Sequence, residues 1–279
     1  MNKANDVFLQ GKSILKQSGI QSFSFDAACL FEHCYNISRH QLLLNPDTLV
    51  DPSGFLELCQ KYASGYPLQY ILKSWQFMDC EFYVDENVLI PRADTETLVE
   101  YVLTLDSKTD ILDMCTGSGC IGISLKKSLP ESNVTLCDIS DGALAVAQKN
   151  ADKNGVKVNV EKADLLKGFA DYFKKESFDV IVSNPPYIKS ADMQTLDKFV
   201  KHEPELALDG GEDGTDFYRA LIIEWKDALK DGGRLVLEAG YDTGADIVSL
   251  FLQNGYTDVV EKKDINGIVR AISAKKTRS

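Results

Sequence analysis

Two consecutive prolines mark the point that most limits what this chain can fold into. Pro185 and Pro186 follow Asn184, which itself follows the mostly apolar run 178–183. A short run rich in Val and Ile predicts a buried strand, and proline has no N–H group to offer a sheet ladder. Each proline also fixes its own φ and restricts the residue before it, so the turn is stiff before any ligand binds. The chain therefore predicts a strand that ends by presenting Asn184.

This turn suits a planar –NH2 group. The side-chain oxygen of Asn184 and the backbone oxygen of Pro185 offer two acceptors, and the ring of Tyr187 offers a flat face beside them. The nitrogen of such a group is a poor nucleophile because its lone pair is delocalised, and holding both hydrogens favours attack on an electrophile. A loop that merely ends a strand is the simpler interpretation, but the complete Asn-Pro-Pro-Tyr motif favours a functional turn. We therefore predict Asn184, Pro185 and Tyr187 as catalytic residues, with Pro186 joining them in binding the substrate.

The net charge of the chain bears on its substrate. It is −12, from 42 acidic and 30 basic residues among 279. An acidic chain lacks the basic surface that supplies most of the affinity for nucleic-acid phosphates, although a local basic patch can lie within an acidic total. The charge therefore weighs against a DNA or RNA substrate without excluding one.

The apolar runs and the cysteines indicate a reduced, cytosolic protein. No stretch approaches the roughly 20 apolar residues of a membrane span, and the first residues lack a signal-peptide core. The seven cysteines include no Cys-x-x-Cys pair, which favours buried thiols over disulfides or a zinc site. We expect a cytoplasmic protein that does not interact with a membrane and holds no metal.

Residues 1–72 predict a small helical domain. Apolar residues recur at helical spacing in three segments, and breaks come at 18–19, 45–46 and 51–54. In the second segment, Phe25 is expected on the same apolar face as Leu30. Because the region offers no cluster of catalytic side chains, we assign it to substrate recognition.

Residues 73–93 predict a β-hairpin connector between two domains. Short β-like runs occur at 75–77, 82–84 and 88–90, and residues 85–87 have the composition of a hairpin turn. Asp94 is then expected to cap a helix that extends to Leu105.

Residues 94–279 predict a larger α/β domain. From Thr109 onward strands and helices alternate, which indicates a mainly parallel sheet covered on both faces. The expected strands are 110–114, 134–137, 156–160, 180–183 and 234–238. After a helix near 245–252, the runs 257–261 and 268–274 predict a hairpin around Asn266-Gly267. This order resembles the class I S-adenosylmethionine-dependent methyltransferases, whose Rossmann-like sheet ends in an antiparallel hairpin.

A glycine-rich turn follows the first predicted strand of this domain. Gly117, Gly119 and Gly122 match the Gly-x-Gly-x-x-Gly fingerprint, and Asp138 lies where a ribose-binding acid belongs. An NAD-binding interpretation therefore competes with a methyl-donor one, since both place a cofactor against the glycine backbone. A dehydrogenase would need a hydride-transfer partner, whereas the fourth strand delivers Asn184, so we favour the methyl donor. Asp164 is expected at an adenine amine, or otherwise at a helix cap.

Several motifs together carry a specific resemblance. The matching residues are 67–71, 82–85, 89–96, 113–121, 182–188, 202–204 and 210–218. In these motifs the chain resembles the bacterial peptide chain release factor glutamine methyltransferases, the HemK or PrmC family, over nearly its full length. The resemblance implies N5 methylation of the glutamine side chain in the Gly-Gly-Gln loop of class I release factors, which supports translation termination. Two departures from the family pattern are Cys115, where glycine is frequent, and Ala93, where proline is usual.

The same resemblance implies the cofactor and its site. S-adenosyl-L-methionine is the expected methyl donor, and S-adenosyl-L-homocysteine is the expected product. The implied cofactor residues are Cys115, Thr116, Gly117, Ser118, Gly119, Asp138, Asp164, Leu165 and Asn184.

Two other functions compete with this one. An adenine amino-methyltransferase acting on DNA or RNA would present an exocyclic amine to the same two acceptors after base flipping. A catalytically inactive binding protein could keep the fold, but the intact glycine turn and Asn184 oppose that reading.

Overall fold

The computed structural model describes residues 1–277 and divides into two compact units. The helical unit comprises Met1–Ser74 together with Asp197–His202. The sheet unit comprises Trp75–Leu196 and the residues from Glu203 onward. The first division lies close to the boundary that we predicted after residue 72, while the assignment of Asp197–His202 to the helical unit was not anticipated.

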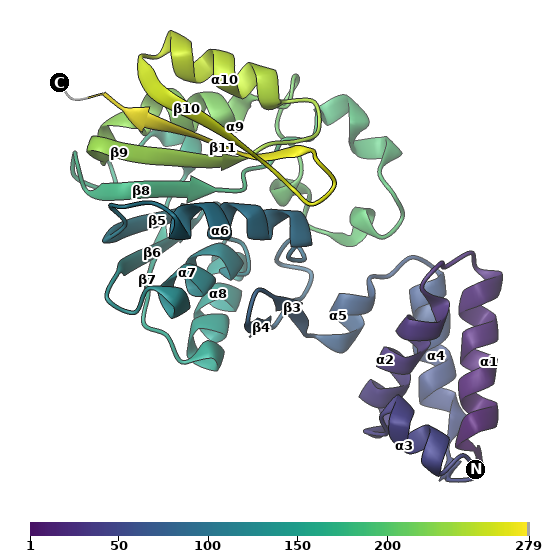
Figure 1. Ribbon diagram of the computed structural model, residues 1–279. Helices are drawn as coiled ribbons and strands as arrows, with labels where there is room; N and C mark the ends of the chain where they lie inside the picture. Colours follow the sequence, from purple (N-terminus) through teal and green to yellow (C-terminus); the bar gives the residue numbers. More distant parts are fainter. Residues whose placement is uncertain (278–279) are drawn as a thin grey trace. The chain divides into compact units, whose positions relative to one another are not determined.

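Five helices build the helical unit, drawn in purple and blue in Figure 1. They are α1 (Ala4–Gln17), α2 (Phe23–Tyr35), α3 (Arg39–Leu44), α4 (Pro52–Ala63) and α5 (Leu68–Leu72), with a two-residue pairing of β1 (Asn2–Lys3) and β2 (Leu49–Val50). Phe31 lies at the centre of the core, with its ring edge-on to Phe8 at 5.5 Å and to Phe55 at 5.0 Å. Phe25, which we expected on the apolar face, is 62% exposed, because the buried stripe of α2 runs through Ala27, Leu30 and Phe31.

The segment 197–202 adds a distant part of the chain to the helical unit. Lys198 Nζ donates to the carbonyl of Ala63 at 2.9 Å, and the Phe199 ring lies 5.3 Å from that of Tyr62. The chain therefore leaves the sheet unit, packs against the helices and returns. Local patterning does not reveal this arrangement, since it depends on contacts far apart in the sequence.

A seven-stranded sheet in the order β10-β11-β9-β8-β5-β6-β7 forms the second unit (Figure 1). The strands are β5 (Asp110–Met114), β6 (Asn133–Asp138), β7 (Asn159–Lys162), β8 (Phe178–Ser183), β9 (Leu229–Glu238), β10 (Tyr256–Lys263) and β11 (Val269–Lys276). The five strands from β5 to β9 pair in parallel, and β11 pairs antiparallel with both β9 and β10. The predicted fold class is therefore confirmed. The third strand begins at Asn159, three residues later than expected.

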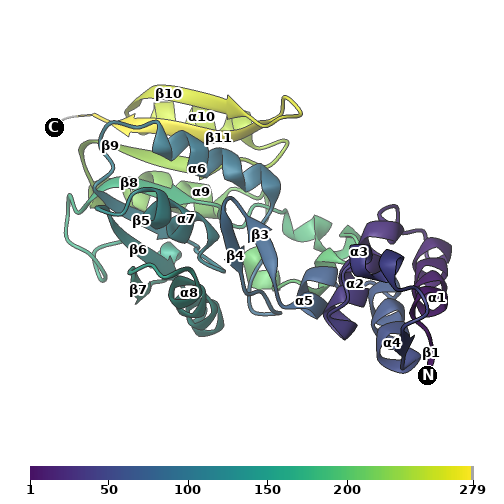
Figure 2. The same ribbon diagram turned by 60° about the horizontal axis from the view of Figure 1, so that its bottom comes forward.

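Helices cover both faces of this sheet. Figures 1 and 2 show α6 (Glu96–Leu103), α7 (Cys120–Ser128) and α8 (Asp141–Asn154) on one face, with α9 (Asp216–Arg219) and α10 (Gly244–Gln253) on the other. A π-helical turn, Ala220–Glu224, continues α9, and short 3-10 turns occupy Ala93–Thr95, Leu165–Lys167, Ser190–Thr195, Glu205–Ala207 and Lys226–Ala228. Because both faces are covered, all six residues of β8 are buried, which explains its continuous apolar run.

The strand order places the site. From β5 the chain proceeds outward through β6 and β7, then returns to β8 on the other side of β5. The loops after β5 and β8 consequently diverge, and ligands of open α/β sheets bind where this happens. Ser183 Oγ donates to the carbonyl of Met114 at 2.6 Å, which ties these two strand ends together.

The connector differs from the prediction. Its hairpin pairs β3 (Trp75–Phe77) with β4 (Cys80–Phe82) and turns at Met78, whose φ is 49° and whose N–H donates to Glu96. Residues 85–87 do form a turn, but it joins no strands, and 88–90 are not a strand. Val88 and Ile90 are each 1% exposed, so their apolar pattern reflects burial rather than pairing in a sheet.

Asp94 does not cap a helix as we expected. Its carboxylate forms an ion pair with Arg270 at 2.9 Å, and α6 starts two residues later and ends at Leu103. Asp94 forms this ion pair instead of capping a helix because β11 places Arg270 close to the start of α6. Only the folded chain brings these two residues together.

Asn150 on α8 links the connector to the glycine turn. Its Oδ1 accepts from the N–H of Tyr83 at 2.6 Å, while its Nδ2 donates to the carbonyls of Tyr83 at 2.9 Å and Ser118 at 2.8 Å. The side chain is fully buried, so water cannot replace these bonds.

Asn150→Ala is expected to lower the free energy of unfolding by about 2–4 kcal/mol, because it leaves buried backbone groups unpaired. Denaturant unfolding followed by circular dichroism measures this change. Gln148→Ala, on the exposed side of the same helix, is the matched control, since the Gln148 side chain donates to Asp152 at the surface. Equal stability of the two variants would contradict the assigned role.

Candidate active site

A single pocket at the carboxyl ends of the strands gathers most of the predicted site residues. Its lining comes from the glycine turn, the ends of β6, β7 and β8, and the segments 87–95 and 204–217. Of the predicted residues, Cys115, Thr116, Gly117, Ser118, Asp138, Asp164, Leu165, Asn184 and Pro186 line it. Gly119, Pro185 and Tyr187 are not among the lining residues.

The glycine turn between β5 and α7 rests on three positive φ angles. These are 60° at Cys115, 53° at Gly117 and 82° at Gly119. A Cβ at Gly119 would lie 2.7 Å from Ile123 Cδ1, whereas one at Gly117 would meet nothing within 4 Å. Gly119 therefore allows close packing, and Gly117 leaves open space. Cys115 adopts the left-handed conformation without being glycine, which accounts for the frequent glycine in the resembling family.

Asp113 supports the glycine turn through hydrogen bonds, a role that we did not predict from the sequence. Its Oδ2 accepts from Thr116 Oγ1 at 2.6 Å and from the N–H of Gly122 at 2.9 Å. Complete burial raises the pKa of this carboxyl to about 7, although both hydrogen bonds oppose the shift. An acid at the end of a first strand, three residues before the Thr of a glycine turn, was the available signal.

Asp138 ends β6 and faces the same turn. Its Oδ2 accepts from the N–H of Gly117 at 2.9 Å, and its Oδ1 accepts from the N–H of Ser140 at 3.0 Å. Burial raises the pKa of the carboxyl, and the backbone N–H groups counteract this. Each oxygen keeps lone pairs for a further donor, so the carboxylate suits two adjacent hydroxyls.

Asp164 and Leu165 lie at the end of β7. Asp164 Oδ1 accepts from the N–H of Leu166 at 3.1 Å, so it caps the short helical turn there, and both residues also line the pocket. The cap that we gave as the alternative is thus present. A contact of Asp164 with adenine stays a prediction.

Asn184 directly follows β8 and lines the pocket, and its Nδ2 donates to Thr95 Oγ1 at 3.3 Å.

Tyr187 lies next to Gly240, where a Cβ would come within 3.0 Å of the Tyr187 ring. Burial, followed by the charge of Glu238, raises the pKa of Tyr187 to about 12, so its hydroxyl stays protonated at neutral pH. Thr95 was not predicted as a site residue.

A glycine-rich loop supports the Asn-Pro-Pro-Tyr turn from behind. Ile188 N–H donates to the Leu208 carbonyl at 2.9 Å, and Gly210 N–H donates back to Ile188 at 2.7 Å. A Cβ at Gly210 would lie 2.6 Å from Tyr187 Cα, and one at Gly214, whose φ is 77°, would lie 2.5 Å from the Tyr187 carbonyl oxygen. Only glycine permits so close an approach of two backbones.

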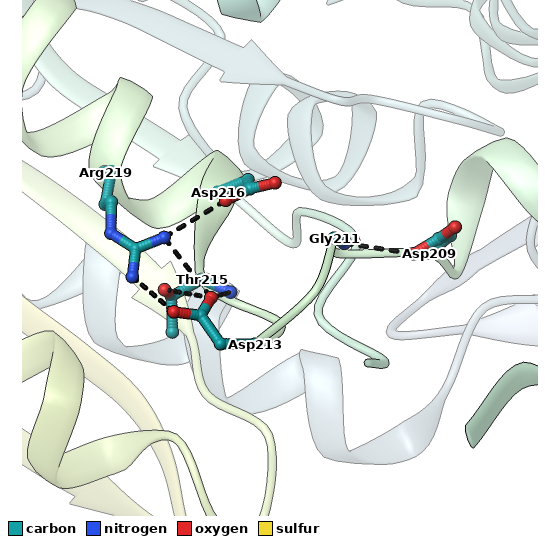
Figure 3. Close-up of polar contacts among 6 residues, drawn as sticks. All are labelled: Asp209, Gly211, Asp213, Thr215, Asp216 and Arg219. Carbon is teal, nitrogen blue, oxygen red and sulfur yellow. Dashed lines mark hydrogen bonds and ion pairs between the residues drawn. The ribbon is translucent and has the colours of Figure 1, made fainter. Parts of the chain in front are cut away.

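Charged side chains hold that loop in shape (Figure 3). Asp213 accepts from the N–H of Thr215 at 3.0 Å and from its hydroxyl at 2.6 Å, and it also pairs with Arg219, which reaches Asp216 at 3.0 Å. Figure 3 also shows Asp209 accepting from the N–H of Gly211, at 3.0 Å. The Arg219 guanidinium holds the pKa of Asp213 well below its usual range, which keeps the carboxylate ionised.

Comparison with known proteins identifies the family. The family model described as PrmC N-terminal domain matches residues 6–72, and the one described as Methyltransferase small domain matches residues 93–215. A release factor glutamine methyltransferase of Geobacter sulfurreducens is 35% identical over 269 residues, covering 95% of this chain and 93% of the relative. This chain belongs to the release factor glutamine methyltransferase family. A relative of the same name from Moorella thermoacetica is 40% identical and covers 85% of each chain.

Two further comparisons bear on fold and substrate. A ribosomal protein uL3 glutamine methyltransferase of Francisella tularensis is 41% identical over 188 residues, but these cover only 65% of this chain and 59% of that relative. A methyltransferase structure from Pyrococcus furiosus superposes with a TM-score of 0.55 at 18% identity, covering 75% of this chain and 94% of that one. The latter likeness concerns the methyltransferase fold alone.

Among residues 1–277, no three His, Cys, Asp or Glu side chains are grouped so that they could hold a metal ion. No helix in this part of the chain combines the length and the apolar character that a membrane span requires.

Gly214→Ala is expected to reduce methyl transfer more than tenfold, because the new Cβ pushes against the Tyr187 carbonyl and displaces the turn. Gly155→Ala is the matched control. Gly155 also has a positive φ, 68°, but a Cβ there meets nothing within 4 Å, so it carries only the conformational cost. Equal activity of the two variants would show that the loop does not position the turn.

Proposed function

We propose that this protein transfers a methyl group from S-adenosyl-L-methionine to the side-chain amide nitrogen of the glutamine in the Gly-Gly-Gln loop of class I release factors. One observation carries the proposal: Asn184, at the end of β8, lines the same pocket as the glycine turn and Asp138. Similarity to relatives of that name over 95% of the chain, including the helical region, supports the substrate. The reaction belongs in the cytoplasm, where release factors act.

The residues of the pocket fit this cofactor. Cys115, Thr116, Gly117 and Ser118 line the pocket and would lie against it, with Gly117 leaving open space for it. Gly119, which we also assign to the cofactor turn, lets that turn pack closely against Ile123. Asp138 would accept the two ribose hydroxyls, and Asp164 with Leu165 would meet the adenine. When bound, the cofactor supplies an electrophilic methyl group attached to a sulfonium sulfur.

The protein's own groups hold and align the nucleophile. Asn184 Oδ1 and the Pro185 carbonyl accept the two N–H bonds of the glutamine amide. As the nitrogen gains positive charge these donors strengthen, so both acceptors bind the transition state better than the ground state. Most of the acceleration comes from alignment, because the electrophile is already reactive. Tyr187, with its pKa near 12, offers a face for stacking rather than a base.

The helical region supplies recognition of the protein substrate in this proposal. The chain matches its relatives both there and in the sheet unit, whereas the uL3 methyltransferase matches over a shorter span. A nucleic-acid substrate is disfavoured by the net charge of −12.

A methyl-transfer assay with radiolabelled cofactor tests the function directly. The full-length protein is offered a class I release factor, ribosomal protein uL3, duplex DNA and RNA side by side. We expect label on the release factor, at the glutamine of its Gly-Gly-Gln loop. Loss of one acceptor in Asn184→Ala should lower the rate by about ten- to a hundredfold. Label on uL3 or on nucleic acid alone would overturn the substrate assignment.

Asp138→Ala is expected to weaken binding of S-adenosyl-L-methionine at least tenfold, because it removes the acceptor for the ribose hydroxyls. Isothermal titration calorimetry measures the affinity. Asp141→Ala is the control, since Asp141 lies on the exposed start of α8 and pairs with Lys162. Unchanged affinity in the Asp138 variant would remove the ribose assignment.

A further inference from the structure

We propose that Thr95 and Glu238 act as positioning residues that orient the side-chain amide of Asn184, so that its oxygen rather than its nitrogen faces the substrate. The catalytic importance of this orientation rests on the proposed function. The contacts among Asn184, Thr95 and Glu238 exist in the protein without substrate.

The fold brings the three residues together from separate elements. Ser183 of β8 lies opposite Leu237 of β9 in the parallel pairing, so Asn184 and Glu238 leave the sheet at the same edge. Thr95 directly precedes α6, which packs against β9, β10 and β11. Asn184 Nδ2 donates to Thr95 Oγ1 at 3.3 Å. The Thr95 side chain also lies close enough to the Glu238 carboxyl to oppose the rise of its pKa. Thr95 and Glu238 are each only 2% exposed, so water cannot substitute for either of them.

The number of hydrogen-bond donors among Asn184, Thr95 and Glu238 determines how the Asn184 amide is oriented. An ionised carboxylate only accepts, so the single hydroxyl proton of Thr95 is directed to Glu238. The Thr95 oxygen is then left as an acceptor, and the group of Asn184 that satisfies it is the –NH2. A flipped amide would place two oxygens against each other. The same contact that buries Nδ2 therefore leaves Oδ1 as the acceptor for the glutamine amide.

Charged groups around Glu238 make this arrangement depend on pH. Burial raises the pKa of Glu238 to about 7, while Thr95, Arg270 and Arg92 counteract the shift and Asp94 adds to it. Arg270 is paired with Asp94 and Asp264, and Arg92 with Glu203. Glu238 Oε2 has no hydrogen-bond partner among residues 1–277.

Three further groups face Glu238 and stay neutral near pH 7. They are Tyr187, Tyr218 and Cys120, whose pKa values burial raises above their usual range. A protonated Glu238 can donate to the Thr95 oxygen and compete with Asn184 for it. Activity should consequently rise with pH as Glu238 ionises. Asp113 also has a pKa near 7, so the pH profile of the wild-type protein alone cannot assign the change to Glu238.

Variants of the full-length protein test the chain of bonds. Thr95→Val removes the hydroxyl at nearly constant shape, and we expect kcat on a release factor to fall about tenfold or more, with cofactor affinity within twofold of wild type. Thr95→Ser, which restores the hydroxyl, should recover most of the rate. Thr135→Val is the matched control, because Thr135 is a buried threonine of β6 that accepts from Asn159 outside the pocket. Wild-type kcat in Thr95→Val would overturn the proposal.

Glu238→Gln separates positioning from structural support. Glutamine keeps an acceptor for Thr95 but cannot ionise, so we expect the activity change near pH 7 to disappear while the rate at higher pH stays within about fivefold of wild type. The same pH dependence in wild type and Glu238→Gln would show that another group, such as Asp113, causes it, and would overturn the role of Glu238.

A spectroscopic readout keeps this inference distinct from the proposed function. The side-chain 15N–1H signals of Asn184, assigned by their loss in Asn184→Ala, should shift in Thr95→Val and through pH 7 in wild type. They should not shift in Thr135→Val, nor with pH in Glu238→Gln. Asn184 side-chain signals at the same chemical shifts in Thr95→Val and in wild type would overturn the inference. A protein that methylates no release factor, yet shows these shifts, would refute the proposed function and leave the orientation of Asn184 established.

Discussion

The burial of β8 between β5 and β9 is the constraint on which the site depends. All six residues of β8 are buried, and the strand stops where proline removes the next N–H groups. A strand that is paired on both sides cannot shift its register without moving all of its buried apolar side chains. The position of its end is therefore fixed by the packing of the core. The position of Asn184 is therefore a consequence of sheet packing rather than of the loop that follows it.

The turn after β8 needs support that proline alone does not provide. The Ile188 N–H donates to the Leu208 carbonyl, the Gly210 N–H donates to the Ile188 carbonyl, and Gly214 lies against the Tyr187 carbonyl. Arg219 and Asp213 in turn brace the second loop through charged contacts. The stiffness of the turn thus comes from two sources, the fixed φ of the prolines and a backing loop that only glycine allows to approach.

Buried acids recur around the pocket and serve the backbone around them. Asp113 accepts from the glycine turn, Asp138 accepts from Gly117 and Ser140, and Glu203 accepts from the N–H of Ile90 while pairing with Arg92. Burial raises the pKa of each, and the hydrogen bonds these carboxyls accept, with the Arg92 charge at Glu203, oppose that rise. Such acids fix loops at the carboxyl end of the sheet, where a cofactor would otherwise meet mobile backbone.

The sequence by itself determined the fold class, the glycine turn, the strand-end acid Asp138 and the turn at Asn184, because strand periodicity, proline and glycine act locally. It did not reveal the ion pair of Asp94 with Arg270 or the contact of Thr95 with Asn184, since each joins residues far apart in the chain. The hairpin turn at Met78 is local, but it has a positive φ at a residue that is not glycine, so the sequence carried no turn signal there. Nor did it show that Asp197–His202 packs with the helical unit. Local sequence selects conformations of the backbone, whereas the partners of a buried polar side chain are decided only when packing excludes water and leaves one neighbour within reach.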